Sequence, residues 1–259
     1  MPVPSLSIYP VPGLPQIQPG TDLAAVISAA VREAGLEPRN GDIFVVAQKI
    51  ISKTEGRAID LRGVTASPAA TALAKRTDKD ARVVELILQE SNRVVRESPG
   101  VIIVEHRLGI VLANAGIDRS NVTGDEDVVL LLPEDPDASA VRLKTGLEDH
   151  LGVRLGVLIT DSIGRPWRLG TTGIAIGCAG LIALQDLRGS TDLFGRVLQV
   201  AEVATADCLA SAAGLIMGEG SEGIPVALIS GSGVVDRADE EAGQNAKTLL
   251  RPVEEDLFR

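Results

Sequence analysis

Three segments of this sequence place polar side chains that can bind a metal or a ligand directly after an apolar run. ITDSIGR supplies Asp161 and Ser162, ANAGIDRSN supplies Asp118 and Asn121, and AQKIISKTEGR supplies Gln48, Lys49, Ser52 and Lys53. The apolar runs predict strands that end in polar turns. Ligands of α/β proteins commonly bind beyond strand ends, because the strand fixes the loop that carries the polar atoms. Each segment is therefore a candidate ligand-binding loop.

Asp118 and Asp161 have the most specific chemistry in these segments. A single Asp in a turn most often caps that turn or a helix, so neither residue alone indicates a site. Two carboxylates brought together repel, and the pKa of one rises unless a cation stands between them. Mg²⁺ and Mn²⁺ favour carboxylate oxygens, with water and substrate phosphates in the remaining positions. If the two segments meet, the pair predicts a divalent metal site.

The segment MGEGSEG, residues 217–223, formally matches the G-x-G-x-x-G pattern. A helix-like segment precedes it and a strand-like segment follows, which is the reverse of the dinucleotide-binding order, so a Rossmann site is excluded. The main-chain N–H groups of its glycines could still approach an anion. An anion-binding loop and a plain helix-to-strand turn both remain open. An ordinary P-loop is also excluded, because its G-x-x-x-x-G-K-[ST] pattern does not occur.

Three further features each have a structural and a functional interpretation. DLRGSTDLFGR, residues 186–196, gathers Arg188, Asp192 and Arg196 around glycines. It is either a carboxylate-binding loop or a solvated connection. His106 is expected to be structural, and Trp167 is expected to be a packing residue.

Composition limits the class of partner. The net charge of -10 opposes general attraction to nucleic acid or anionic lipid, and the 2% of aromatic residues leaves almost no base-stacking surface. A local cation cluster could still bind phosphate, because the Debye length is about 8 Å at physiological salt. The longest apolar stretch, from Gly173 to Leu184, is too short to span a bilayer. With two cysteines outside any metal spacing, the chain is expected to be cytoplasmic, with no nucleic-acid or membrane partner.

Helical and strand patterns alternate along the chain, which predicts a mixed α/β protein. The expected helices cover residues 23–34, capped by Thr21 or Asp22, residues 67–95, a segment from Asp137 or Ser139 to Gly152, and residues 205–217. The expected strands cover residues 42–47, 101–114 as two strands with a tight turn near Leu108 and Gly109, 128–132, 155–160 and 226–230. These elements would place the three polar segments after strands.

A resemblance extends through nearly the whole chain. It rests on seven segments in order: YPVPGLPQIQPGTDL, VVAQKIISKTEGR, NAGIDRSN, LPEDPDASA, ITDSIGRPWRLGTTGIAIG, DLRGSTDLFGR and MGEGSEGIP. Together these closely resemble the coenzyme F420:L-glutamate ligases, also called F420-0:gamma-glutamyl ligases. The resemblance implies a fold with mixed β-sheets and two intertwined subdomains, formed by residues 1–259 as a single ligase domain. Some bacterial relatives continue into a flavin-binding nitroreductase-like domain, which this chain is expected to lack.

The resemblance also implies an activity. Family members are GTP-dependent enzymes that add L-glutamate to a deazaflavin precursor through gamma-linked amide bonds. They use Mg²⁺ or Mn²⁺ at two sites, are helped by K⁺, and form homodimers. An acyl phosphate made from GTP would activate the carboxylate. Phosphoryl transfer of this kind needs positioning and charge neutralisation more than a protein nucleophile.

Site residues are carried over from the matching motifs. Asp118 and Asp161 would bind metal, with Ser162 and Glu219 completing a second metal position. GTP contacts would come from Gly13, Leu14, Gln48, Lys49, Lys53, Asn121, Met217, Gly218, Gly220, Ser221, Gly223 and Ile224. Lys53 would meet the phosphates, and Arg165 would bind a substrate carboxylate or phosphate. Two alternatives stay open: another metal-dependent amide ligase or NTPase on the same scaffold, and a non-catalytic nucleotide-binding module.

Overall fold

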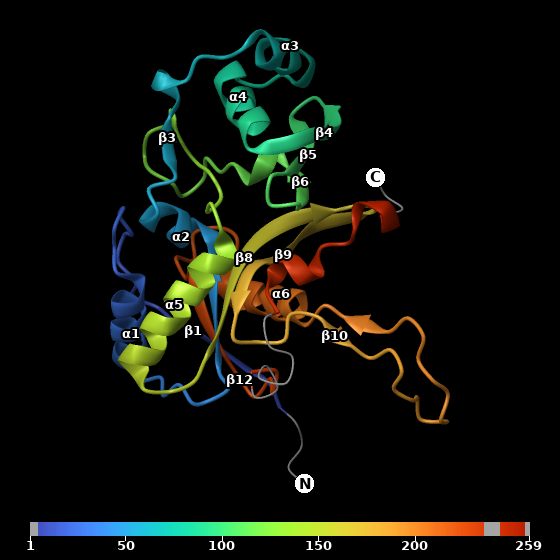
Figure 1. Ribbon diagram of the computed structural model, residues 1–259. Helices are drawn as coiled ribbons and strands as arrows, with labels where there is room; N and C mark the ends of the chain where they lie inside the picture. The colour runs from blue at the N-terminus through green and yellow to red at the C-terminus, as the bar shows by residue number, and fades with distance from the viewer. Residues whose placement is uncertain (1–4, 236–243, 257–259) are drawn as a thin grey trace.

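A five-stranded mixed sheet runs through the centre of the structure (Figure 1). The computed structural model describes residues 5–235 and 244–256. The strands lie in the spatial order β1 (Ser7–Pro10), β12 (Val226–Ser230), β2 (Ile43–Ala47), β8 (Gly156–Arg165) and β9 (Arg168–Ala179). β2 and β8 pair in parallel, whereas the other neighbours pair antiparallel. The predicted mixed α/β class is confirmed.

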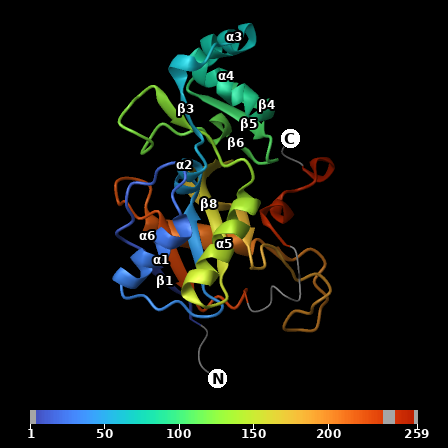
Figure 2. The same cartoon turned by 60° about the vertical axis from the view of Figure 1, so that its left-hand side comes forward.

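Helices cover both faces of this sheet. Successive side chains of a strand point to opposite faces, so Phe44 and Val46 pack toward α1 (Leu23–Glu33) and α5 (Pro136–Leu151). Ile43 and Val45 pack instead toward α6 (Thr205–Met217). Figure 2 brings α1 and α5 forward over the sheet. Burial on both faces explains why β2 is apolar throughout. No helix among the described residues is long and apolar enough to cross a membrane.

The helix starts follow side-chain capping. Asp22 caps α1, as expected, by accepting a hydrogen bond from the backbone N–H of Ala25 at 3.0 Å. The predicted start of α5 at Asp137 or Ser139 is wrong, because Asp135 is the cap and Pro136 occupies the first turn. Asp137 is buried and accepts hydrogen bonds from backbone N–H groups of the C-terminal part of the chain and of β9.

A small lobe, residues 68–113, lies above the sheet in Figure 1. It contains α3 (Pro68–Thr77), α4 (Ala81–Gln89) and the antiparallel sheet β4 (Ser91–Ser98), β5 (Val101–His106) and β6 (Val111–Ala113). Most of its buried apolar side chains form a core cluster separate from the two on the central sheet, whereas Ile110 and Leu112 belong to one of those two. The prediction of helix over residues 67–95 is wrong after Gln89, because β4 pairs with β5 there. The expected tight turn between two strands near Leu108 and Gly109 is confirmed.

Two short strands join the lobe to the central sheet. β3 (Ala58–Asp60) and β7 (Val128–Leu130) pair antiparallel, and β3 leads into the 3-10 helix η1 (Leu61–Gly63). The 3-10 helix η2 (Asn114–Gly116) follows β6, and the loop after it returns to β7. The helix α2 (Gln48–Thr54) begins directly after β2. Two further 3-10 helices, η3 (Ala246–Leu249) and η4 (Val253–Glu255), lie near the C-terminus.

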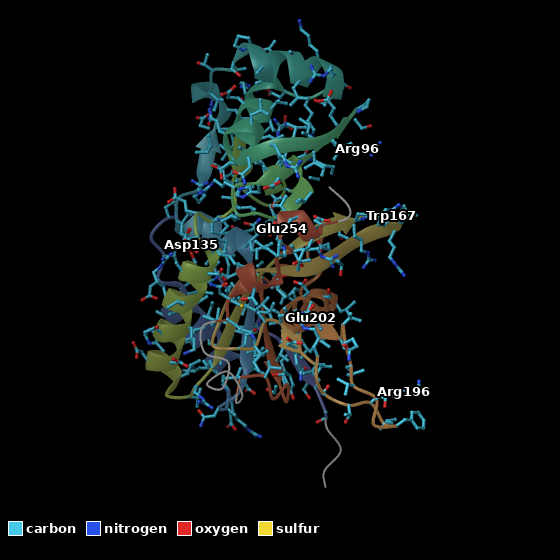
Figure 3. All side chains as sticks on the ribbon, turned by 45° about the vertical axis from the view of Figure 1, so that its right-hand side comes forward. Arg96, Asp135, Trp167, Arg196, Glu202 and Glu254 are labelled. Carbon is cyan, nitrogen blue, oxygen red and sulfur yellow. The ribbon has the colours of Figure 1, made fainter. Side chains whose placement is uncertain are left out.

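Two extensions project from the body. β8 was expected to end at residue 160, but it continues to Arg165 and forms a two-stranded ribbon with β9. The parallel pairing with β2 stops at Thr160. Residues 184–204 form an arm that contains β10 (Gln185–Asp186) and β11 (Glu202–Val203). Trp167, at the end of the ribbon, is 83% exposed rather than packed, and Figure 3 shows it and Arg196 of the arm pointing outward.

Candidate active site

A cavity of about 720 Å³ lies where β2 and β8 stop pairing, at Ala47 and Thr160. Five segments from distant parts of the sequence supply most of its wall: residues 14–17, 47–53, 121–124, 160–162 and 217–225. Gly173 of β9 and two residues of α6 complete it. The carboxyl ends of parallel strands thus meet at one edge of the sheet and position the polar groups, as is common in α/β proteins.

Most of the residues that the motifs singled out line this cavity. They are Leu14, Gln48, Lys49, Lys53, Asn121, Asp161, Ser162, Met217, Gly218, Glu219, Gly220, Ser221, Gly223 and Ile224. Gly13 precedes the first lining segment, and Asp118 lies behind Gln48 and Lys49, in contact with both. Arg165 is exposed on the projecting ribbon, outside the cavity wall.

The helix α2 fixes the position of Asp118. The expected polar turn after β2 is instead this helix, so residues four apart share a face. The buried Ser52 hydroxyl donates to Gln48 Oε1 at 2.9 Å, and Gln48 Nε2 donates to Asp118 Oδ2 at 3.0 Å. Lys49 Nζ lies 3.5 Å from the same carboxylate oxygen. Asp118 is therefore held by an oriented amide and a cation.

Asp161 and Ser162 lie inside a strand rather than in a turn after it. A β-bulge interrupts the β8–β9 pairing between Ile159 and Thr160, immediately before them. Bulges bend a strand and redirect its side chains, and they are frequent next to functional sites. The Ser162 hydroxyl donates to Glu219 Oε2 at 2.9 Å, which joins β8 to the loop after α6.

The arrangement of charged groups in the site favours a bound cation. Burial and the neighbouring Asp118 raise the pKa of Asp161 to about 7. Burial also raises the pKa of Asp118, and the charge of Glu219 adds to this effect. Burial lowers the pKa of Lys53, and the charge of Lys49 lowers it further. A bound cation would offset the repulsion that disfavours ionisation of Asp118 and Asp161.

The loop that carries Asp118 closes one side of the cavity. Lys49 Nζ lies 3.2 Å from Ser120 Oγ, and Lys53 Nζ donates to the Asn121 carbonyl oxygen at 2.7 Å. Asn121 Nδ2 donates to the Gly220 carbonyl oxygen at 3.2 Å. Asn121 thus connects this loop to the glycine-rich loop across the cavity.

The glycine-rich segment connects α6 to β12, in the helix-to-strand order expected from the sequence. Gly218 has a φ of +74°, which favours glycine because a Cβ would be strained there. The Gly220 N–H donates to Glu222 Oε2 at 2.8 Å. A main-chain donor that already binds a carboxylate is able to bind an anion, which supports the functional interpretation of this loop.

The donor set suits a metal that a ligand helps to bind, rather than a closed protein cage. Among the described residues, no three His, Cys, Asp or Glu side chains converge closely enough to hold an ion by themselves. Mg²⁺ in nucleotide sites takes one or two carboxylates and completes its shell with water and phosphate oxygens. Asp118 and Asp161, each with a raised pKa, together with the Ser162 hydroxyl, fit that pattern.

Some wall residues were not found by sequence reasoning. Gly173 of β9 faces α6, where a Cβ would lie 2.7 Å from the Ala210 carbonyl oxygen. Ala210 and Gly214, four residues apart on α6, also line the cavity. Small residues at helical spacing were the available signal, and they allow the helix to approach the strand closely. The segment 186–196 forms an exposed part of the arm, where Arg188 pairs with Asp186 and Glu202.

Comparison with known proteins gives a consistent result. The family model described as F420-0:Gamma-glutamyl ligase matches residues 13–231. The chain is 44% identical over 258 residues to the coenzyme F420:L-glutamate ligase of Methanopyrus kandleri, covering 99% of both chains. It is 43% identical to the enzyme of that name from Methanothermobacter thermautotrophicus, covering 98% of this chain and 99% of the relative. For the Archaeoglobus fulgidus enzyme the identity is 41%, covering 98% and 96%. The matched residues include all five segments of the cavity wall, and the chain therefore belongs to the F420-0:gamma-glutamyl ligase family.

Proposed function

We propose that this protein joins L-glutamate to the deazaflavin precursor F420-0 through gamma-linked amide bonds, using GTP. Its nearly full-length relatives bear the name coenzyme F420:L-glutamate ligase. The observation that carries the proposal is the cavity that combines Asp161, a carboxylate whose pKa is raised to about 7, with Lys49, Lys53 and a glycine-rich loop. These groups match a nucleotide with its metal ions, whereas a purely apolar ligand would leave them unpaired.

The reaction needs carboxylate activation, because a carboxylate does not condense with an amine in water. The γ-phosphoryl group of GTP is transferred to the substrate carboxylate, which gives an acyl phosphate and GDP. The amine of L-glutamate then attacks the acyl carbon, forms the amide bond and releases inorganic phosphate and a proton. Such a sequence depends mainly on positioning and on neutralising phosphate charge.

Each part of the cavity has a role in this scheme. Lys49 and Lys53 bind phosphate oxygens, and the Gly220 N–H, now bound to Glu222, exchanges that carboxylate for phosphate. Asp118, Asp161, Ser162 and Glu219 would hold Mg²⁺ or Mn²⁺ together with phosphate oxygens, and the metal would neutralise phosphate charge, with K⁺ as an auxiliary cation. Asn121 orders the loop at the nucleotide. Arg165 lies outside this wall, so its predicted role toward a substrate carboxylate or phosphate stays a prediction.

The test is a single incubation analysed for two products. The purified protein is mixed with GTP, Mn²⁺, L-glutamate and F420-0, and mass spectrometry follows glutamyl additions while GDP is quantified. Glutamylated product with equimolar GDP supports the proposal. GDP release without glutamylation would favour another ligase or NTPase, and nucleotide binding without turnover would favour a non-catalytic module.

We also propose a homodimer, working in the cytoplasm. Large apolar side chains gather on the two projecting extensions: Leu169 and Leu193 are each 98% exposed, and Phe194 is 89% exposed. Exposed apolar groups of this kind commonly mark interaction surfaces. Sedimentation of the wild-type protein and of the Leu193→Ser/Phe194→Ser variant tests this: the wild type should sediment as a dimer and the variant as a smaller species. A monomeric wild type would refute it.

A further inference from the structure

The loop of residues 117–127, here called the Asp118 loop, is held from two opposite sides. Its inner side faces α2, where Gln48, Lys49 and Lys53 contact it. Its outer side faces η1 and the start of α4. Lys49 and Lys53 are the groups to which we assign phosphate binding, so a bound nucleotide would compete for their contacts to the loop. The outer contacts do not take part in that competition.

Two arginines form the shortest outer ion pairs, and Arg119 of the loop itself lies 3.7 Å from Asp80. Arg62 Nη2 lies 2.8 Å from Asp125 Oδ2, and Arg82 Nη2 lies 3.0 Å from Asp127 Oδ1. The Leu61 N–H also donates to the Asp127 carbonyl oxygen at 2.8 Å. Both arginines lie outside the cavity wall. They can therefore act on the nucleotide only through the loop.

Each arginine is oriented before it reaches the loop. Both belong to an Asp-x-Arg segment, and the Asp caps the helix that follows: Asp60 for η1 and Asp80 for α4. Asp60 Oδ1 lies 2.8 Å from Arg62 Nε, and Asp80 Oδ2 lies 2.7 Å from Arg82 Nη2. A guanidinium fixed by its own helix cap loses little further entropy when it binds the loop carboxylate.

The same Asp-x-Arg arrangement recurs at Asp186 and Arg188, where the arginine again connects two segments. Asp186 fixes Arg188 by a contact of 2.7 Å, and Arg188 then reaches Glu202 on the neighbouring strand at 3.2 Å. There it joins β10 to β11. The corresponding pairs at η1 and α4 join these two helices to a loop that has no regular secondary structure of its own between η2 and β7.

We propose that Arg62 and Arg82 are positioning residues, which hold the Asp118 loop in the arrangement that binds nucleotide. The proposal rests on the GTP-dependent function proposed above. Both arginines are partly exposed, at 59% and 35%, so their ion pairs contribute little to global stability. Their effect lies in the fraction of molecules whose loop is correctly placed, and the apparent affinity for a ligand falls in proportion to that fraction.

This mechanism predicts different effects on kcat and on the KM for GTP. Saturating GTP draws the loop into place, so kcat should stay within about twofold of wild type in Arg62→Ala, Arg82→Ala and the double variant. The KM for GTP should rise about 3-fold in each single variant and about 10-fold in the double variant, given the modest strength of exposed pairs. Arg82→Lys should recover part of the loss, because it keeps the charge without the guanidinium fork.

The matched control is Arg76→Ala. Arg76 lies in the small lobe, as Arg82 does, and makes an ion pair of similar type, 2.6 Å from Glu97, that does not touch the Asp118 loop. It should leave the KM for GTP unchanged while shifting the unfolding temperature as much as the test variants do. A double variant whose KM stays within twofold of this control, or whose kcat falls at unchanged KM, would overturn the proposal.

A second measurement does not depend on the activity. Amide hydrogen exchange of residues 118–124 in the nucleotide-free protein should become at least about fivefold faster in Arg62→Ala/Arg82→Ala and stay unchanged in Arg76→Ala. Equal exchange in the two variants would refute the positioning role even if the protein proves to be a GTP-dependent ligase. If exchange is faster in the double variant but the wild type binds no GTP, the positioning role holds and the proposed function fails.

Discussion

The side-chain amide of Gln48 donates a 3.0 Å hydrogen bond to the carboxylate of Asp118, although 70 residues separate them. Because Ser52 donates to the amide oxygen of Gln48, the amide cannot flip without breaking both bonds. Gln48 is 1% exposed and Ser52 is fully buried. An uncharged helix residue thus sets the direction in which a candidate metal ligand points.

Replacing Gln48 tests that relationship. Gln48→Met keeps the length of the side chain but removes both polar atoms, so the Ser52 hydroxyl and the Asp118 carboxylate each lose a partner. We expect a loss of about 1–3 kcal/mol in unfolding free energy, and a KM for Mn²⁺ raised about 10-fold. Urea unfolding and metal titration of the activity measure the two effects. An unchanged metal dependence would show that Gln48 does not orient Asp118.

Asp161→Asn should reduce turnover by at least about 1000-fold and leave the fold intact. Burial and the charge of Asp118 raise the pKa of Asp161, which means that its ionised form is disfavoured in the folded protein. Asn removes this buried charge, so the unfolding temperature without metal should not fall. Circular dichroism and thermal unfolding test the fold, and glutamylation tests the activity. Wild-type turnover in this variant would refute the metal role.

Stability at acidic pH should depend on Glu90, which lies between α4 and β4. Burial raises its pKa, but the nearby His106 ring at 3.5 Å, the hydrogen bond from Arg107 and the charges of Arg107 and Arg57 outweigh that effect and lower the pKa to about 2. The folded pKa lies below the unfolded value, so this stabilisation is present above about pH 4.5 and is lost as the pH falls toward 2.

The variant Glu90→Gln isolates this contribution. It removes the charge that lies 2.9 Å from the Arg57 guanidinium in the wild type, and Arg57 keeps only the exposed carboxylate of Glu134 at 3.4 Å. We expect a loss of about 2–3 kcal/mol at pH 7 that shrinks toward zero near pH 2, measured by urea unfolding at several pH values. A constant difference between wild type and variant across that range would contradict the assignment.

Close packing of α6 on β9 predicts opposite effects of one methyl group at two glycines. A Cβ at Gly173 would lie 2.7 Å from the Ala210 carbonyl oxygen, whereas a Cβ at Gly214 of α6 would meet no atom within 4 Å. Gly173→Ala should therefore cost about 1–3 kcal/mol. Gly214→Ala should stabilise by about 0.5–1 kcal/mol, since Ala favours a helix interior. Thermal unfolding of both variants decides, and equal shifts would contradict the model of close approach.

The sequence motifs located the cavity better than the local patterns located the elements. Asp161 shows why, because the residues after it, with Gly164 and Pro166, form a pattern typical of a turn. The strand continues there because β9 pairs with it across a bulge, and no local pattern reports that pairing. Val94 and Val95 similarly extend a helical pattern, yet pairing with β5 places them in a strand.

The meeting of Asp118 with Asp161 could not be predicted from either segment. It depends on the parallel pairing of β2 with β8, which are more than 100 residues apart in the chain. The family motifs identified the lining residues because the resemblance covers all the segments that this pairing brings together. Hydrophobic periodicity, in contrast, describes only one element at a time. The position of Arg165 on the ribbon shows the limit of motif transfer, because adjacency in sequence to Ser162 did not place it in the cavity wall.

The ribbon of β8 and β9 has a mechanical consequence. Asp161 belongs to the same strand as the outermost residues of that ribbon, and the pairing with β9 is continuous from Asp161 to Gly164 before its register shifts at Arg165. A hydrogen-bonded pair of strands bends as a unit, so a molecule that grips the far end of the ribbon would turn the carboxylate at its base. A molecule bound at the far end of the ribbon would therefore change the position of Asp161 in the cavity.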